Sequence, residues 1–224
     1  ATFVVNDDAE FTTDIQVLLT NSSTESVQMQ FSNDGVSYSS WAAYSATHNW
    51  TLENTEGEQT VFGQFMDSAG NITQTNDTIT LDTEAPVASF AINNDEAVTG
   101  ELDVVLNNSV TGSAEMQFSN DGVTYSGWVA YNSTFAWILP AGDGEHTVHG
   151  QFRDVAGNVA AATDAIILDQ TSPEGFFVIN DNDDFTNDLN VVLTNNVTGV
   201  TEMQFSNDGV SYSDWAAYAA SIDW

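Results

Sequence analysis

The sequence offers few side chains for catalysis near neutral pH. It has three histidines, His48, His146 and His149, and no cysteine. His48 has no histidine counterpart in the repeats described below, and His146 and His149 stand three residues apart on a predicted strand, where they point to opposite faces. Nucleophilic catalysis requires a nucleophile, a base and an orienting group that converge. We therefore expect a protein that is not an enzyme.

Acidic side chains are the other group that could bind a ligand, and they suggest calcium as a cofactor. Ca²⁺ takes about six to eight oxygen ligands, which clustered Asp and Asn side chains and turn carbonyls supply. We expect Asp82 and Asp169, in predicted linkers, to lie one sandwich edge from the acid-rich turns at 93–96 and 180–184. The hairpin acids Asp67 and Asp154 are candidates for the same end. A merely solvated acidic surface is the alternative. The candidate calcium ligands at the junctions are Asp82, Asp95, Glu96, Asp169, Asp181, Asp183 and Asp184.

Three Asn-x-Ser/Thr sequences form a further candidate set, for N-glycosylation. They begin at Asn21, Asn107 and Asn196, within one residue of the same place in each repeat. We expect them in the loop after the predicted strand that ends at Leu19 in the first repeat. Glycosylation requires that the protein is exported from a cell that makes N-glycans.

The charge of the chain excludes several classes of partner. One Lys or Arg, which is Arg153, stands against 33 acidic residues, and the formal net charge is −32. Nucleic acids and anionic membrane surfaces bind clustered Lys and Arg, so we expect neither as a partner. No apolar run approaches the about 20 residues of a membrane helix. Salt relieves self-repulsion, since the Debye length falls to about 3 Å at 1 M, and a salty or cation-rich exterior suits the chain.

An internal repeat of 87 residues organises the sequence. The segment EMQFSNDGV occurs at Glu115–Val123 and again at Glu202–Val210, and the corresponding segment of the first copy ends at Val36. LDTEAP, from Leu81 to Pro86, and LDQTSP, from Leu168 to Pro173, lie one period apart and have the composition of linkers. The predicted domains are therefore 1–85, 86–172 and 173–224.

Apolar and polar residues alternate within each unit, which predicts β-strands. Val27, Met29 and Phe31 form one alternating run, followed by a predicted hairpin turn at 33–35, and a second hairpin turn is predicted at 67–71. About seven short strands per unit are typical of an immunoglobulin-type or fibronectin-like sandwich. The residues expected to be buried are Ile15, Val17, Leu19, Met29, Phe31 and Phe65, with their equivalents 87 positions later.

Tryptophan and tyrosine recur at fixed places in every unit, as at Trp41, Tyr44 and Trp50. A cysteine-free sandwich needs such aromatic rings to fill its core, so we interpret them as core or interface packing. Contact with surface glycans is the alternative.

The combination FSNDGVxYSxWxxY, GDGEHTVHGQFRDVAGN and LDxxxP resembles the tandem immunoglobulin-like repeats of large bacterial and archaeal cell-surface proteins. The resemblance covers the whole chain. It implies an all-β protein of tandem immunoglobulin-like (fibronectin-like) β-sandwich domains, the third one incomplete. Modules of this type serve adhesins, surface coats, filaments and enzyme appendages alike.

The function expected from these features is structural and extracellular. We predict a cell-surface fibre, filament or stalk whose partners are other copies or further repeats of the same protein. One alternative is an adhesin stalk that presents a ligand-binding tip, and another is an accessory module array of a secreted polysaccharide-active enzyme.

The third unit lacks everything that matches 57–81, and half a sandwich exposes an open sheet edge and a bare apolar face. We therefore expect the 224 residues to be an excerpt of a longer polypeptide, in which the missing strands follow Trp224.

Overall fold

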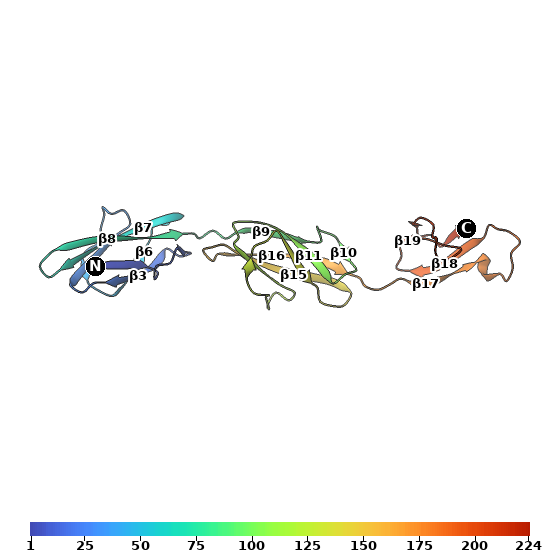
Figure 1. Cartoon of the computed structure of the whole chain (residues 1–224), viewed down its shortest axis with the longest axis horizontal. Coiled ribbons are helices and arrows are strands. Elements are labelled where there is room, and N and C mark those ends of the chain that lie inside the picture. Colours follow the sequence, from blue (N-terminus) through green and yellow to red (C-terminus); the bar gives the residue numbers. More distant parts are fainter. The chain divides into compact units, whose positions relative to one another are not determined.

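A computed structural model describes all 224 residues. Its regular secondary structure consists of β-strands and one turn of 3₁₀ helix at Asn180–Asn182 (Figure 1). The all-β prediction is confirmed. The chain divides into two compact units, Ala1–Asp169 and Gln170–Trp224. We call residues 1–85, 86–172 and 173–224 the first, second and third repeat, with boundaries that stay predictions. The structure holds no helix of the length and apolarity that a membrane crossing needs.

The first repeat is a sandwich of two sheets. Three strands form one sheet in the order β1-β3-β6, and five form the other in the order β2-β8-β7-β4-β5. All pairs are antiparallel except β2 with β8, because the chain changes sheet between β1 and β2. The strands are β1 (Thr2–Val5), β2 (Phe11–Thr12), β3 (Gln16–Ser22), β4 (Ser26–Ser32), β5 (Ala42–Ala43), β6 (Thr47–Thr51), β7 (Gly57–Asp67) and β8 (Ile72–Leu81).

The second repeat has the same topology, with sheets β14-β11-β9 and β10-β16-β15-β12-β13. Its long hairpin, β15 with β16, occupies the place of β7 with β8 (Figure 1). The strands are β9 (Val87–Ile92), β10 (Val98–Thr99), β11 (Asp103–Thr111), β12 (Glu115–Ser119), β13 (Val129–Ala130), β14 (Thr134–Ile138), β15 (Gly144–Arg153) and β16 (Val159–Leu168).

Each complete core is built around three phenylalanines from three strands. In the first repeat Phe31 makes edge-to-face contacts with Phe3, at 5.5 Å between ring centroids, and with Phe65, at 5.9 Å. Such offset geometries are the favoured ones for aromatic pairs. The rings rest on a glycine of the central strand, since a Cβ on Gly63 would lie 2.8 Å from Phe3. The second repeat repeats this arrangement over Gly150.

The predicted burial holds for most of the first two repeats. Ile15 and its counterpart Leu102 are half-buried rather than buried, because they stand at the sheet ends. Val27, which the alternation placed on the dry face, is 47% exposed, since the pairing of β4 with β7 shifts register beside it. The residues that are buried as predicted are Val17, Leu19, Met29, Phe31 and Phe65, with Val104, Leu106, Met116, Phe118 and Phe152.

The two predicted turns differ in outcome. Asp67–Asn71 does connect a tight hairpin, in which the Asp67 N–H donates to the Asn71 carbonyl at 3.1 Å. The turn at 33–35 is not a tight hairpin, because the chain makes a longer loop before β5 returns along β4. That loop is organised by the Asp34 carboxylate, whose Oδ1 accepts the N–H groups of Val36 and Ser37, both at 2.7 Å.

One half-buried Asp carboxylate joins the two sheets of each complete sandwich. The Oδ2 of Asp77, on β8, accepts the N–H of Val5, on β1, at 2.8 Å. In the second repeat Asp164 accepts the N–H of Ile92 at 2.7 Å. These bonds join strands of opposite sheets, so the side chain satisfies a backbone donor that has no strand partner.

The third repeat keeps one sheet, β17-β18-β21, and only the pair β19-β20 of the other. No counterpart of β15 or β16 covers it, so the burial expected here is wrong for several positions. Leu193 is buried, but Leu189, the counterpart of Ile15, is 98% exposed. The elements are β17 (Glu174–Ile179), the turn Asn180–Asn182, β18 (Val192–Thr198), β19 (Glu202–Met203), β20 (Ala216–Ala217) and β21 (Ser221–Asp223).

Candidate functional site

The linker between the first two repeats is bonded by side chains from both. Within the first repeat the Asp82 N–H donates to the Thr12 carbonyl at 3.0 Å, which continues the pairing of β2 with β8. From the second repeat the Asn158 side-chain amide donates to the Asp82 carbonyl at 2.9 Å, and its distance to Asp82 Oδ1 is 3.4 Å. We call Asp82, Asp154 and Asn158 the junction.

The hairpin turn between β15 and β16 positions the amide of Asn158. The Oδ1 of Asp154 accepts the N–H groups of Gly157 at 2.7 Å and Asn158 at 2.9 Å, and its Oδ2 accepts the Asn158 amide at 3.1 Å. The same turn in the first repeat, Asp67–Asn71, has the equivalent bonds. The two turns differ in their surroundings, because the turn of the second repeat lies beside the linker, where Asp154 is only 8% exposed.

A second pair of bonds holds the next residue of the linker. The Glu56 carboxylate, in the loop before β7, accepts the Thr83 N–H at 3.0 Å and also accepts the Thr83 hydroxyl. Pro86, the last residue of the linker sequence and the first of the second repeat, lies near Gly112, where an added Cβ would be 3.9 Å from the Pro86 Cα. The linker is therefore held at successive residues by contacts to both repeats.

Asn158 and Glu56 were not among the candidates that the sequence suggested. The available signal was the motif Asp-x-x-Gly-Asn, present at 67–71 and 154–158 and followed in each repeat by the closing strand. The turn between β15 and β16 lies at the end of the second repeat that is nearest the preceding linker. The copy of the motif at 154–158 can therefore reach Asp82.

The turn at 93–96 does not approach Asp82, contrary to the prediction. β9 begins at Val87, directly after the linker, and the turn follows its far end at Ile92. Six strand residues span about 20 Å at about 3.3 Å each. Asp95 and Glu96 instead lie at the end of the second repeat where Asp169 lies, since the Asp169 N–H donates to the Thr99 carbonyl at 2.9 Å.

The same displacement applies to Asp181, Asp183 and Asp184 in the unit Gln170–Trp224. They follow the far end of β17 rather than its beginning. The Asp183 N–H donates to the Asn180 carbonyl at 3.1 Å, which closes the turn. No group of three or more Asp, Glu or His side chains anywhere in the 224 residues is arranged to hold a metal ion.

These turns are rich in Asn and Asp for a conformational reason. Asn93, Asn94 and Asp95 all have left-handed backbone geometry, with φ of 48°, 58° and 71°, and the corresponding turns of the other repeats do the same. Asn and Asp tolerate this region better than other residues with a side chain. The Asn93 side chain also accepts the Val105 N–H at 2.9 Å, which ties the turn to β11.

The three candidate glycosylation sites lie within strands, not in a loop. β3 continues to Ser22, and Asn21 is buried, with its amide nitrogen donating to the Ser45 carbonyl at 3.0 Å. Its true counterparts are Asn108 and Asn195, which make the same kind of bond. Asn107 and Asn196 are one residue out of step, and a shift of one residue places a side chain on the opposite face of a strand.

Each histidine makes its own local contact. His48 stacks on Phe31 at 5.1 Å, as Phe135 stacks on Phe118 in the second repeat. His146 Nε2 is 2.7 Å from the Gly142 carbonyl oxygen, and the His149 ring covers Gly122.

The repeated tryptophans take two roles. Trp50 packs against the core, and its indole N–H donates to the Asn33 side chain at 2.6 Å. Trp137 does the same with Asn120 at 2.7 Å. Trp128, on the outer surface, lies under the Arg153 guanidinium, whose Cζ is 4.4 Å from the ring centroid.

The loop carboxylates of the repeats have lowered pKa values. In the third repeat the backbone N–H groups of Ser211 and Val210, followed by the Ser206 hydroxyl, lower the pKa of Asp208 to about 2. Equivalent bonds, led by the N–H groups of Ser37 and Thr124, hold the pKa of Asp34 and of Asp121 well below the usual range. Hydrogen bonds to the ionised form are the cause.

Neither a protein-family model nor a curated protein sequence matches the chain. Fibronectin(III)-like modules of CbhA from Clostridium thermocellum are similar in structure, with a TM-score of 0.50 and 16% identity over 75% of this chain and 94% of that chain. A Ca²⁺-stabilised adhesin with which an Antarctic bacterium binds ice has a TM-score of 0.43 and 18% identity over 91% of this chain and 59% of that chain. A 1.5-MDa bacterial ice-binding adhesin has a TM-score of 0.43 and 16% identity over 91% of this chain and 77% of that chain. The first of these likenesses shows the fold, and the chain is accordingly built of fibronectin-III-like, immunoglobulin-like β-sandwich modules in tandem.

Proposed function

We propose that the chain is part of an extracellular, non-catalytic array of β-sandwich modules that acts as a spacer in a cell-surface fibre, filament or adhesin stalk. The observation that carries the proposal is the bonded linker. Asn158 holds Asp82 from one side and Glu56 holds Thr83 from the other, so the linker is suited to fixing a distance. A flexible tether would leave these backbone groups to water.

The chemistry of the surface supports a passive role. His48 is stacked on Phe31, and His146 Nε2 is 2.7 Å from the Gly142 carbonyl oxygen, so both rings make local structural contacts. The net charge of −32 opposes close association of arrays at low salt and favours solubility. The partners that we propose are further repeats of the same protein, with surface glycans as candidates for a separate ligand-binding region.

Labelling of intact cells that produce the protein tests the location. Antibodies raised against residues 1–224 are expected to bind the outer surface of unpermeabilised cells, and external protease is expected to remove the label. Label that appears only after permeabilisation would contradict the proposal. The mass and sequence of the intact native polypeptide distinguish a fibre or stalk of many repeats from an array joined to a catalytic domain.

Calcium stays a proposal for one place, around Asp82 and Asp154. The Asn158 amide nitrogen faces three oxygens there, namely the Asp82 carbonyl at 2.9 Å, Asp154 Oδ2 at 3.1 Å and Asp82 Oδ1 at 3.4 Å. A half-turn of that amide would place its own oxygen beside these three, and a cation held among them would have four oxygen ligands. Water would complete the shell that Ca²⁺ requires.

A further inference from the structure

One Asp-Gly bond lies in the same loop of each repeat, after Asp34, Asp121 and Asp208. Such a bond is chemically labile, because glycine has no Cβ to shield its backbone nitrogen from the carboxyl of the preceding aspartate. When that nitrogen bonds to the aspartate Cγ, its proton and the hydroxyl of the carboxylic acid leave as water, and a cyclic imide forms. Water then adds to the α-carbonyl carbon and breaks the bond between that carbon and the nitrogen. The product is isoaspartate, through which the chain runs by way of Cγ.

The loop that contains this bond closes on a core phenylalanine. In the second repeat the Phe118 N–H donates to Ser126 Oγ at 3.2 Å, and the Phe118 carbonyl accepts the Ser126 N–H at 2.9 Å. Isoaspartate would lengthen the backbone between these two residues by one carbon, so the two bonds could not both keep their geometry. The modification would therefore disturb the core, since Phe118 contacts both Phe90 and Phe152.

A serine hydroxyl at the beginning of the loop holds both groups that would react. Ser119 Oγ accepts the Gly122 N–H at 3.0 Å and donates to Asp121 Oδ1 at 2.7 Å. Ser32 makes the same two bonds in the first repeat, at 3.0 Å and 2.7 Å. Both serines are only 1% exposed, so water does not compete for their hydroxyl groups. The glycine nitrogen and the carboxylate are thus each tied to a third group rather than directed at each other.

The backbone beyond the glycine holds the carboxylate as well. Asp121 Oδ1 accepts the N–H groups of Val123 at 2.8 Å and Thr124 at 2.7 Å. These bonds hold the pKa of Asp121 well below its usual range, because they favour the ionised form. An ionised carboxylate lacks the hydroxyl that must leave as water. The same set of bonds therefore opposes both requirements of ring closure, a free nitrogen and a protonated acid.

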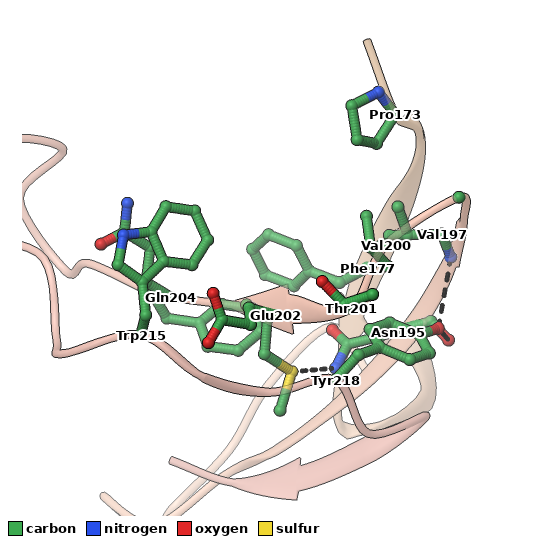
Figure 2. A pocket seen from close by; sticks show the side chains of 13 residues that line it. Pro173, Phe177, Asn195, Val197, Val200, Thr201, Glu202, Gln204, Trp215 and Tyr218 are labelled. Carbon is green, nitrogen blue, oxygen red and sulfur yellow. Dashed lines mark hydrogen bonds between the residues drawn. The ribbon is translucent and has the colours of Figure 1, made fainter. Parts of the chain in front are cut away.

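The third repeat shows that the loop forms these bonds without covering strands. No strand equivalent to β15 lies over this repeat, and Figure 2 shows the side chains of Phe177 and Trp215 along its uncovered side. The Ser206 hydroxyl nevertheless donates to Asp208 Oδ1 at 2.8 Å and accepts the Gly209 N–H at 2.9 Å. The geometry is accordingly a property of the loop sequence itself.

We propose that Asp34 and Asp121 are latent sites of self-modification to isoaspartate, and that Ser32 and Ser119 are the positioning residues that keep these sites closed. The modification needs no enzyme, metal or reactant other than water, and it proceeds when the loop opens. Each loop is therefore a lock on the chemical lifetime of its repeat. The proposal does not depend on the proposed function, since the bonds are the same wherever the protein is located.

Prolonged incubation of residues 1–224 at neutral pH tests the proposal, with isoaspartate measured at each site by peptide mass spectrometry. Asp121 in the folded protein should isomerise at least about tenfold more slowly than in the synthetic peptide of residues 115–127, a factor that corresponds to one hydrogen bond to a charged group. Equal rates in the protein and the peptide would overturn the proposal.

The role of the serine is tested by a pair of variants in one loop. Ser119→Ala should accelerate isomerisation of Asp121 about tenfold, because it releases the glycine nitrogen and one bond to the carboxylate. Ser126→Ala is the matched control, since its hydroxyl bonds to Phe118 and not to the reacting groups, and it should leave the rate unchanged. Asp143, which precedes a glycine outside this loop, reports any unfolding of the repeat. No acceleration in Ser119→Ala, or equal acceleration at Asp143, would overturn the proposal.

A second variant keeps the loop bonds and uses a faster reaction. Asp121→Asn retains an Oδ1 that accepts the same N–H and hydroxyl groups, and its ring closure releases ammonia, so deamidation appears as a change in mass. In the folded protein this variant should deamidate at least about tenfold more slowly than the peptide of residues 115–127 with the same substitution. Adding Ser119→Ala should remove most of that difference. Deamidation at the rate of the peptide, in a protein that melts like the wild type, would overturn the proposal.

Discussion

Replacing Gly150 by alanine should destabilise the second repeat through its aromatic triad. An added Cβ would lie 3.0 Å from ring carbons of both Phe118 and Phe90 and 3.1 Å from Phe152. Overpacking of a core costs about 1–3 kcal/mol. The lower entropy of the unfolded alanine chain returns about 0.4–1 kcal/mol. The expected net loss is about 1–2 kcal/mol, or about 5–10 °C in the melting temperature of a module this size.

The closer approach at Gly63, where the added Cβ would lie 2.8 Å from Phe3, should make Gly63→Ala at least as costly for the first repeat. Gly100→Ala is the matched control, because its Cβ would meet only the Asp169 carbonyl at an ordinary 3.6 Å. Site-resolved hydrogen exchange measures the free energy of opening for each repeat separately. Equal stability of Gly150→Ala and Gly100→Ala would refute the packing of the triad on glycine.

Three further predictions concern the Asp164 carboxylate, the Asp208 carboxylate and the junction. Asp164→Asn should weaken the bond that closes the second sandwich and cost about 1–2 kcal/mol, with faster exchange of the Ile92 amide; unchanged exchange would contradict the bond. Asp208 should titrate at about 2 in a carbon-detected NMR titration. Because its folded pKa lies below the ordinary value of about 3.9, its contribution to stability is complete above that value and is lost as the pH falls toward 2; an ordinary pKa would contradict the loop geometry. If Ca²⁺ binds at the junction, chelation should lower the melting temperature of the wild type but not of Asp154→Asn, and an unchanged wild type would end the calcium proposal.

The sequence was sufficient to predict the fold because the relevant signal is periodic. Alternation at Val17 and Leu19 identifies a buried strand face, and the 87-residue spacing transfers each strand to the next repeat. The hairpin at 67–71 was predicted for the same reason, since its turn residues stand between two alternating runs. Alternation failed at Val27, where a register shift turns the side chain outward.

The junction was harder to predict because spatial position along a strand is not visible in a local pattern. Asp95 is near Asp82 in sequence, yet a whole strand separates them. Asn158 is 76 residues from Asp82 and contacts it. Likewise, Asn21 and Asn107 looked equivalent, but the one-residue offset places only Asn21 on the buried face. Leu189 shows the third cause, because burial depends on a covering strand that residues 170–224 do not supply.

The central claim is that side chains fix the linker between the first two repeats, and residual dipolar couplings test it most directly. In the wild type, one alignment tensor should describe the couplings of residues 2–81 and 87–168. Asn158→Ala removes the bonds to Asp82 and should require two tensors, whereas Asn71→Ala, which alters the equivalent turn without touching the linker, should still require one. Two different tensors in the wild type, or a single tensor in Asn158→Ala, would contradict the account.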